Sequence, residues 1–146
     1  SPFYIMESNI KDEKPLIKPN GIIINPPSKP SINGLNTGKI KEEHEFKIKS
    51  SDPEDDILYY LVDWGDDSKE WYGPYESGEE IIVTHSWEKK GEYKIKVKCS
   101  DMYGAKSDWE SLEVTMPRAR IRNIHIFRFL QNFPMFNQII NFLIKS

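Results

Sequence analysis

The chain has 146 residues, which is enough for one domain with terminal extensions and too few for two full domains. Hydrophobic residues make up 38% and aromatic residues 12% of the sequence, so a real core is expected and wholesale disorder is excluded. The net charge of -3 gives no reason to expect nucleic acid as a partner.

Residues 1–30 are rich in proline and lysine and are predicted to form an extended leader or linker. Within this segment, the sequence Gly-Ile-Ile-Ile at residues 21–24 is apolar enough to add a strand to a sheet edge. The prolines of residues 25–30 are typical of an interdomain hinge, because consecutive prolines favour an extended, stiff backbone.

From residue 31 to residue 117 the sequence is typical of short strands separated by turns. Three segments, around Phe46, Ile95 and Val114, alternate apolar and polar residues. A period of two places one face of each strand in a core and the other in water. Residues 57–64, 71–75 and 80–86 are further strand candidates, and the intervening turns contain Gly, Asn or Asp. About seven strands with such frequent turns predict an all-β sandwich of two sheets.

Cys99 is the only cysteine, so the chain forms no internal disulfide. It alternates with Val97 and Ile95, which predicts a small buried core residue and not a reactive thiol.

Residues 118–146 are predicted to be an amphipathic helical tail, interrupted at Pro134. This tail carries five basic residues and no acidic one, whereas residues 1–117 carry 15 basic and 23 acidic residues. The tail is therefore expected to dock on the body or on another subunit; a membrane surface is the alternative. Its polar residues exclude a transmembrane segment. The apolar side chains predicted to dock are Phe129, Leu130, Phe133, Phe136, Ile140 and Leu143.

Three stretches carry motifs in a characteristic order. The first is the acidic turn of residues 51–56, followed by Asp-Trp-Gly-Asp at residues 63–66. The second joins His-Ser-Trp at residues 85–87 to Gly-Glu-Tyr at 91–93, and the third joins Ser-Asp at 100–101 to Tyr-Gly-Ala at 103–105. Over residues 28–116 the sequence resembles the PKD-type (polycystic kidney disease) domains of archaeal and bacterial cell-surface or secreted proteins. The resemblance implies an immunoglobulin-like sandwich with an extracellular or cell-surface location.

One position departs from this family. Its usual Gly-Asp-Gly turn is Gly65-Asp66-Asp67 here, so an aspartate replaces a glycine that would adopt a positive φ easily.

Four residues are predicted to maintain the fold: Trp64, Trp87, Gly91 and Tyr93. Trp64 is a large apolar anchor on a central strand. Tyr93 follows a glycine turn, where its ring packs and its hydroxyl reaches backbone, as in a tyrosine corner.

Calcium binding is one hypothesis for the acidic turn. In a sandwich of this strand order, the loops after residues 44–50 and 93–100 emerge at the same end. Hard oxygen ligands in such density suit calcium. The residues that would meet there are Asp52, Glu54, Asp56 and Asp101. The alternative is a solvated acidic turn in which Asp52 caps its own backbone.

A second hypothesis is a platform for stacking sugars, formed by Trp71, Tyr72, Tyr75 and Trp109. The alternative is that these aromatic residues cover the edge of the sandwich or seat the tail.

No constellation of catalytic residues is found in the sequence. His85 and Ser86 are adjacent in one strand and point to opposite faces, so they cannot form a nucleophile–base pair. A zinc site lacks ligands, and there is no glycine-rich phosphate loop.

The predicted function is therefore structural: a non-catalytic spacer, adhesion or assembly module. Its expected partners are other domains of the parent protein or identical subunits. Two alternatives stay open, a carbohydrate-binding accessory module of a secreted enzyme and a self-assembling filament or surface-layer subunit that uses its terminal segments.

Overall fold

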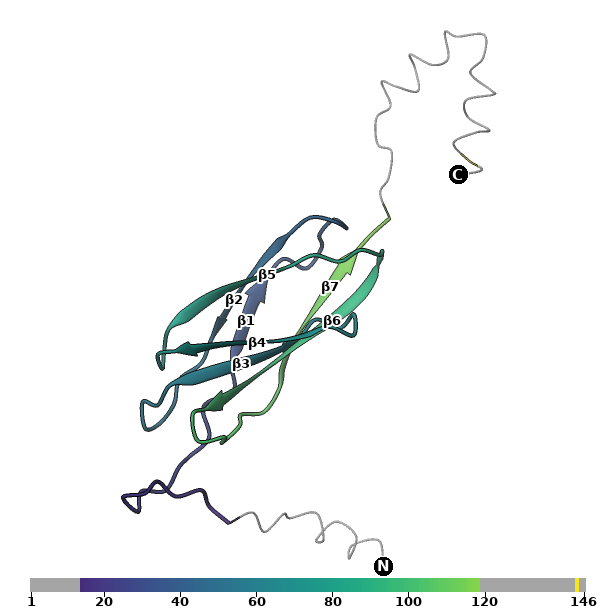
Figure 1. The fold of residues 1–146 in the computed structure, drawn as a ribbon. Coiled ribbons are helices and arrows are strands. Elements are labelled where there is room, and N and C mark those ends of the chain that lie inside the picture. Colours follow the sequence, from purple (N-terminus) through teal and green to yellow (C-terminus); the bar gives the residue numbers. More distant parts are fainter. Residues whose placement is uncertain (1–13, 119–143, 145–146) are drawn as a thin grey trace, which may run out of the picture.

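The computed structural model describes residues 14–118 and Ile144. Seven strands form two antiparallel sheets that pack face to face (Figure 1). One sheet has the order β1-β2-β5, with β1 at Ser31–Gly34, β2 at His44–Lys49 and β5 at Glu80–His85. The other has the order β4-β3-β6-β7, with β3 at Leu58–Asp63, β4 at Lys69–Tyr75, β6 at Gly91–Asp101 and β7 at Glu110–Met116. The predicted all-β sandwich is confirmed, and the predicted helical tail with its docking residues lies outside the described residues.

The core forms where the apolar residues of the two sheets alternate inward. In β2, Phe46 and Ile48 are fully buried, whereas Glu45, Lys47 and Lys49, which alternate with them, are exposed. The other core residues from the strands are Ile32, Leu58, Tyr60, Val62, Ile81, Val83, Ile95, Val97, Cys99, Val114 and Met116. Cys99 is buried as predicted, and burial raises the pKa of its thiol to about 12.

An aromatic cluster fills the end of the core opposite the acidic turn. The Trp64 and Trp87 rings are fully buried, and their centroids lie 6.1 Å apart in an edge-to-face arrangement. The Phe46 ring packs against both indoles, with its centroid 5.7 Å from that of Trp64 and 6.0 Å from that of Trp87. The Trp87 indole N–H donates to the Trp64 carbonyl at 3.3 Å. The cluster thereby joins β2 and the segments that follow β3 and β5.

The tight turn after β3 requires glycine at position 65. Gly65 has φ +78°, and a Cβ there would lie 2.8 Å from the Lys94 carbonyl oxygen. The Asp63 carboxylate accepts the Gly65 N–H at 3.0 Å and closes the turn. Asp67, two residues later, also has a positive φ of 68°. This is the position at which the family resemblance implies glycine.

The turn before β6 is fixed by Tyr93. Its hydroxyl donates to the Lys89 carbonyl at 2.6 Å, and its ring stacks on Trp87 with centroids 5.4 Å apart. This is the backbone bond that the glycine turn and the following tyrosine predict.

A short crossover ties the two sheets together after β1. The Gly38 N–H donates to the Thr115 carbonyl at 3.0 Å, and the Thr115 N–H donates to the Asn36 carbonyl at 2.8 Å. The segment that follows β1 therefore leaves the first sheet and pairs in parallel with β7 of the second sheet.

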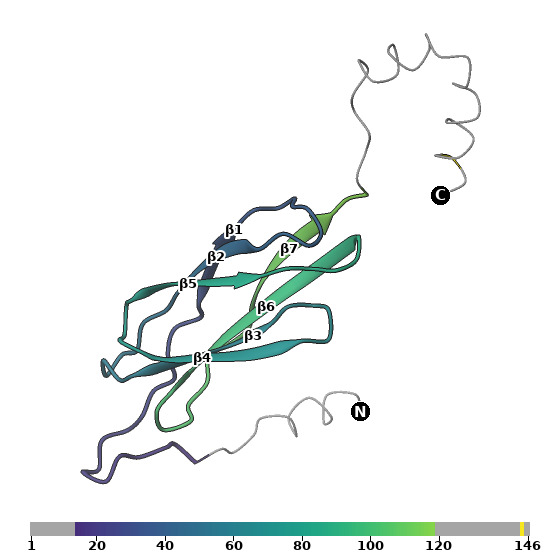
Figure 2. The same ribbon diagram turned by 45° about the horizontal axis from the view of Figure 1, so that its top comes forward.

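The leader reaches the sandwich at one pole, and the chain leaves β7 at the opposite pole (Figures 1 and 2). Ile24, Pro27 and Pro30 are buried at intervals of three residues, which is the repeat of a polyproline-type segment with one face on the protein. Residues 25–30, expected as a hinge, thus lie against the sandwich. Among the described residues no helix is long and apolar enough to cross a membrane.

The positive φ at Asp67 yields a stability prediction. Asp67→Val is expected to lower the free energy of unfolding by about 1–2 kcal/mol, because a β-branched side chain clashes in this conformation. Asp67→Gly is expected to be at least as stable as the wild type. Urea unfolding measures both, with Lys90→Val as the control at an exposed loop position. Equal losses for Asp67→Val and Lys90→Val would contradict the assigned backbone conformation.

Candidate cation site

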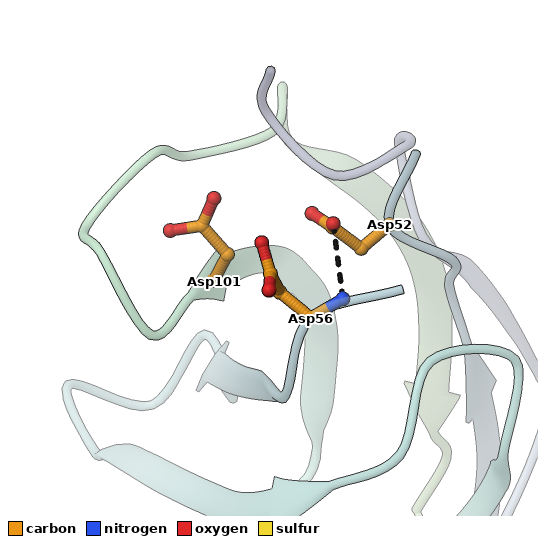
Figure 3. Close-up of side chains that lie close together, drawn as sticks. All are labelled: Asp52, Asp56 and Asp101. Carbon is orange, nitrogen blue, oxygen red and sulfur yellow. Dashed lines mark hydrogen bonds between the residues drawn. The ribbon is translucent and has the colours of Figure 1, made fainter. Parts of the chain in front are cut away.

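Two loops meet at the pole where the leader arrives, which we call the acidic pole. The register of β3 and β6 pairs Leu58 with Asp101, so the loop before β3 and the loop after β6 lie side by side. Carboxylate oxygens of Asp52, Asp56 and Asp101 all lie within 4.8 Å of one another. In Figure 3 the Asp56 carboxylate lies between the other two. The sandwich topology therefore gathers three acidic side chains that are up to 49 positions apart in the sequence.

The first loop is organised around the Asp52 side chain. Its Oδ1 accepts the backbone N–H of Glu54 at 2.9 Å and that of Asp56 at 3.2 Å (dashed line in Figure 3). Asp52 is 7% exposed, and its Oδ2 is buried without a hydrogen-bond partner among the described residues. One oxygen of this carboxylate thus shapes the loop, and the other accepts no hydrogen bond from the described residues.

The second loop repeats this arrangement around Asp101. The Oδ1 of Asp101 accepts the N–H groups of Tyr103 and Ala105, both at 2.9 Å. Asp101 is only 3% exposed, and its Oδ2 is also buried without a partner in the described part of the chain. Asp52 and Asp101 therefore each keep one buried carboxylate oxygen without a hydrogen-bond partner in the described part of the chain.

The third carboxylate is bound by the leader. The Lys18 ammonium donates to Asp56 Oδ1 at 2.8 Å and lies 2.8 Å from Asp56 Oδ2. It also lies 5.0 Å from the centroid of the Tyr103 ring. The hydrogen bond to Asp56 raises the pKa of Lys18, although burial opposes this effect. Lys18 is thus a protonated cation held on the acidic cluster by its own chain.

Glu54, the fourth predicted calcium ligand, is turned toward the leader. Its Oε1 accepts hydrogen bonds from the backbone and side-chain amides of Asn25. The structure therefore brings three of the four predicted residues together and places Glu54 beside them as a contact of the leader.

Burial dominates the electrostatics of the first loop. It raises the pKa of Asp52 above its usual value, and the charges of Asp56 and Glu54 act in the same direction. The two backbone N–H groups on Asp52 oppose the shift but do not reverse it. A cluster of hard oxygen atoms with excess negative charge is suited to holding a cation.

His85 forms a pair with Asp66 that sequence reasoning missed. Its Nε2 lies 2.8 Å from Asp66 Oδ2. Its ring stacks on Trp64, with the ring centroids 4.4 Å apart and an interplanar angle of 5°. Burial raises the pKa of Asp66, but hydrogen bonds from Ser68 and His85 outweigh it and the net direction is down. The pair links the β3–β4 turn to β5 beside the aromatic cluster.

The four aromatic residues predicted as a sugar platform differ in burial. Trp71 and Trp109 are 57% and 39% exposed. The Lys98 ammonium lies over the Trp109 ring, 4.7 Å from its centroid. The other two, Tyr72 and Tyr75, are partly buried and pack against the core.

Comparisons with known proteins place residues 25–116 under a single family model, described as a PKD domain. A solved structure, the PKD domain of an M14-like peptidase from a Thermoplasmatales archaeon, is 41% identical with a TM-score of 0.63. The match covers 65% of this chain and 99% of that one. The CARDB domain of a Pyrococcus furiosus protein matches at 12% identity and a TM-score of 0.42, over 60% of this chain and 90% of that one. No curated protein matches the chain.

The bare, buried oxygen of Asp52 yields a prediction for stability. At pH 7 without divalent cations, Asp52→Asn is expected to raise the free energy of unfolding by about 0.5–2 kcal/mol. The amide keeps the oxygen that accepts the two backbone N–H groups and removes a buried charge. Urea unfolding in chelator measures this, and Asp52→Ala, which removes the acceptor, is the destabilised control.

The difference in stability between Asp52→Asn and the wild type is expected to depend on pH. Because the folded-state pKa of Asp52 is raised, the native state holds this proton more tightly than the unfolded state. Its contribution to stability is fully present below the unfolded value and declines as the pH rises through the folded pKa. The advantage of Asp52→Asn should therefore grow from pH 3 to pH 7. An advantage that shrinks over this range would contradict the raised pKa.

Proposed function

Because the chain belongs to the PKD domain family, we propose that it is a non-catalytic spacer module of an extracellular or cell-surface protein. The 41% identical relative is the PKD domain of a peptidase, which supports a role as an accessory domain of a larger protein. In this proposal the module acts through contacts with its neighbours in the parent protein and carries out no reaction.

The positions at which the chain enters and leaves the sandwich support a spacer. The leader approaches at the acidic pole, and β7 ends at the opposite pole (Figure 1). The longest strand, β6, has 11 residues and spans about 33 Å between the two poles at 3.3 Å per residue. A domain placed in series between two others would hold them apart by this length.

The packing of residues 24–30 on the sandwich carries the proposal. Besides the three buried apolar residues of this segment, Ser28 joins the edge of the first loop by main-chain and side-chain bonds. The Ser28 N–H donates to the Ser51 carbonyl at 2.8 Å, and the Ser50 hydroxyl donates to the Ser28 carbonyl at 2.6 Å. A segment held in this way transmits an orientation, whereas a free linker would transmit only a maximum distance.

Distance measurements between two spin labels test this proposal. The labels are attached in the full chain through Ile22→Cys in the leader and Glu88→Cys near the opposite pole, and the buried Cys99 is expected to stay unlabelled. A narrow distance distribution is expected in chelator. Replacing Pro26 and Pro27 by glycine should broaden it, because the leader gains backbone freedom and loses a buried contact.

Pro117→Gly is the matched control, since Pro117 is an exposed proline beyond β7. It should leave the distribution unchanged. If the labelled chain with Pro26 and Pro27 intact already gives a distribution as broad as that of the double glycine variant, the spacer proposal is wrong.

A further inference from the structure

The acidic pole combines unpaired carboxylate oxygens with a cation supplied by the leader. We propose that Asp52, Asp56 and Asp101 form a divalent-cation site of the calcium type, and that Lys18 competes with the cation for Asp56. Cation binding would then release the leader hairpin, residues 16–24, from the pole. This inference rests on the proposed function only in that the leader is attached to the sandwich.

The bare oxygens of the two loops are the observation that points to a ligand. Asp101 and Asp52 are 3% and 7% exposed, and each has one oxygen that is saturated by two backbone N–H groups. The second oxygen of each is buried and has no partner among residues 14–118. A buried, unpaired carboxylate oxygen is destabilising unless a cation or a donor satisfies it. Both aspartates belong to the cluster that contains Asp56.

The geometry and the ligand type select the cation. Two oxygens that bind one calcium ion at 2.3–2.6 Å lie within about 5 Å of each other, and the three carboxylates meet this limit at 4.8 Å. All the ligand atoms are hard oxygens, with no imidazole or thiolate in the group. Calcium tolerates the irregular arrangement that two loops provide better than magnesium, which demands an octahedron.

Lys18 already occupies part of this site as a tethered monovalent cation. Its ammonium lies 2.8 Å from both oxygens of Asp56, so a metal ion bound to the same oxygens would lie within a few ångströms of it. Two positive charges at this separation repel strongly in a partly buried site. The ammonium and the divalent cation therefore exclude each other at Asp56.

The leader hairpin has few other contacts that would hold it on the pole. It is closed by its own backbone bonds, Ile24 N–H to the Leu16 carbonyl and Lys18 N–H to the Ile22 carbonyl, both at 2.8 Å. Leu16, Ile17, Ile22 and Ile23 are 44–57% exposed, so the hairpin buries little apolar surface before Ile24. The contacts of Lys18 with Asp56 and Tyr103 are thus central to its attachment, and their loss would free it.

Calorimetric titration of the full chain with calcium chloride tests the site. Lys18→Met keeps the length of the side chain and removes its charge, so it is expected to bind calcium about tenfold more tightly than the wild type. Lys47→Met is the matched control, because Lys47 pairs with Glu80 within the β1-β2-β5 sheet, at 3.4 Å, and not with the acidic cluster. Asp101→Asn keeps the oxygen that accepts the Tyr103 and Ala105 N–H groups, so it should fold and lose calcium binding.

The spin-label pair at positions 22 and 88 reports on release. Calcium should broaden the distance distribution of the wild type to that of Lys18→Met in chelator, and magnesium at the same concentration should do so less. Wild type and Lys18→Met with equal calcium affinity, or calcium that binds while the distribution stays narrow, would overturn the competition. Absence of calcium binding in both proteins would overturn the site.

The two proposals fail separately in these measurements. A spin-label distance distribution that is broad in chelator would contradict the spacer proposal. The difference in calcium affinity between wild type and Lys18→Met would still test the cation site. A distribution that is narrow in chelator and does not change with calcium would agree with the spacer proposal and contradict the release of the leader.

Discussion

The acidic pole depends on two aspartates that each use one carboxylate oxygen to shape a loop. Asp52 and Asp101 accept two backbone N–H groups apiece, and these bonds fix the loops before β3 and after β6. Because the loops are fixed in this way, the second oxygen of each aspartate is also fixed, inside the pole and away from water. The negative charge is therefore a consequence of how the backbone turns. It is offset in this structure by the ammonium group of Lys18 on Asp56.

The opposite end of the sandwich is held by a different interaction. Trp64 and Trp87 are fully buried and pack edge to face, and the rings of Phe46 and His85 complete the cluster. The turn that presents Trp64 requires Gly65, whose missing side chain lets the backbone of Lys94 approach. The sandwich thus has a buried aromatic end and a charged end to which the leader is attached. The first buries the two largest side chains of the core, and the second holds the ion pair between the leader and Asp56.

The leader is attached to the charged end by two kinds of contact. The leader contacts the pole through apolar packing at Ile24, Pro27 and Pro30 and through the ion pair of Lys18. The apolar contacts do not respond to ions, whereas the ion pair competes with any cation that reaches Asp56. The attachment thus has an apolar part next to the sandwich and a part farther out for which we propose a response to divalent cations.

The sequence by itself determined the sandwich, the buried Cys99 and the bond from Tyr93 to the backbone. These features rest on local patterns: a period of two in β2, β6 and β7, and a glycine turn before an aromatic residue. It also indicated that the acidic loops share one end, because strand order alone decides that. Only the tertiary structure decided which carboxylates converge, since Glu54 turns to Asn25 while Asp56 turns to Lys18. Lys18 lies 38 residues from Asp56 in a leader with no periodic signal, so no local pattern could have assigned it to the site.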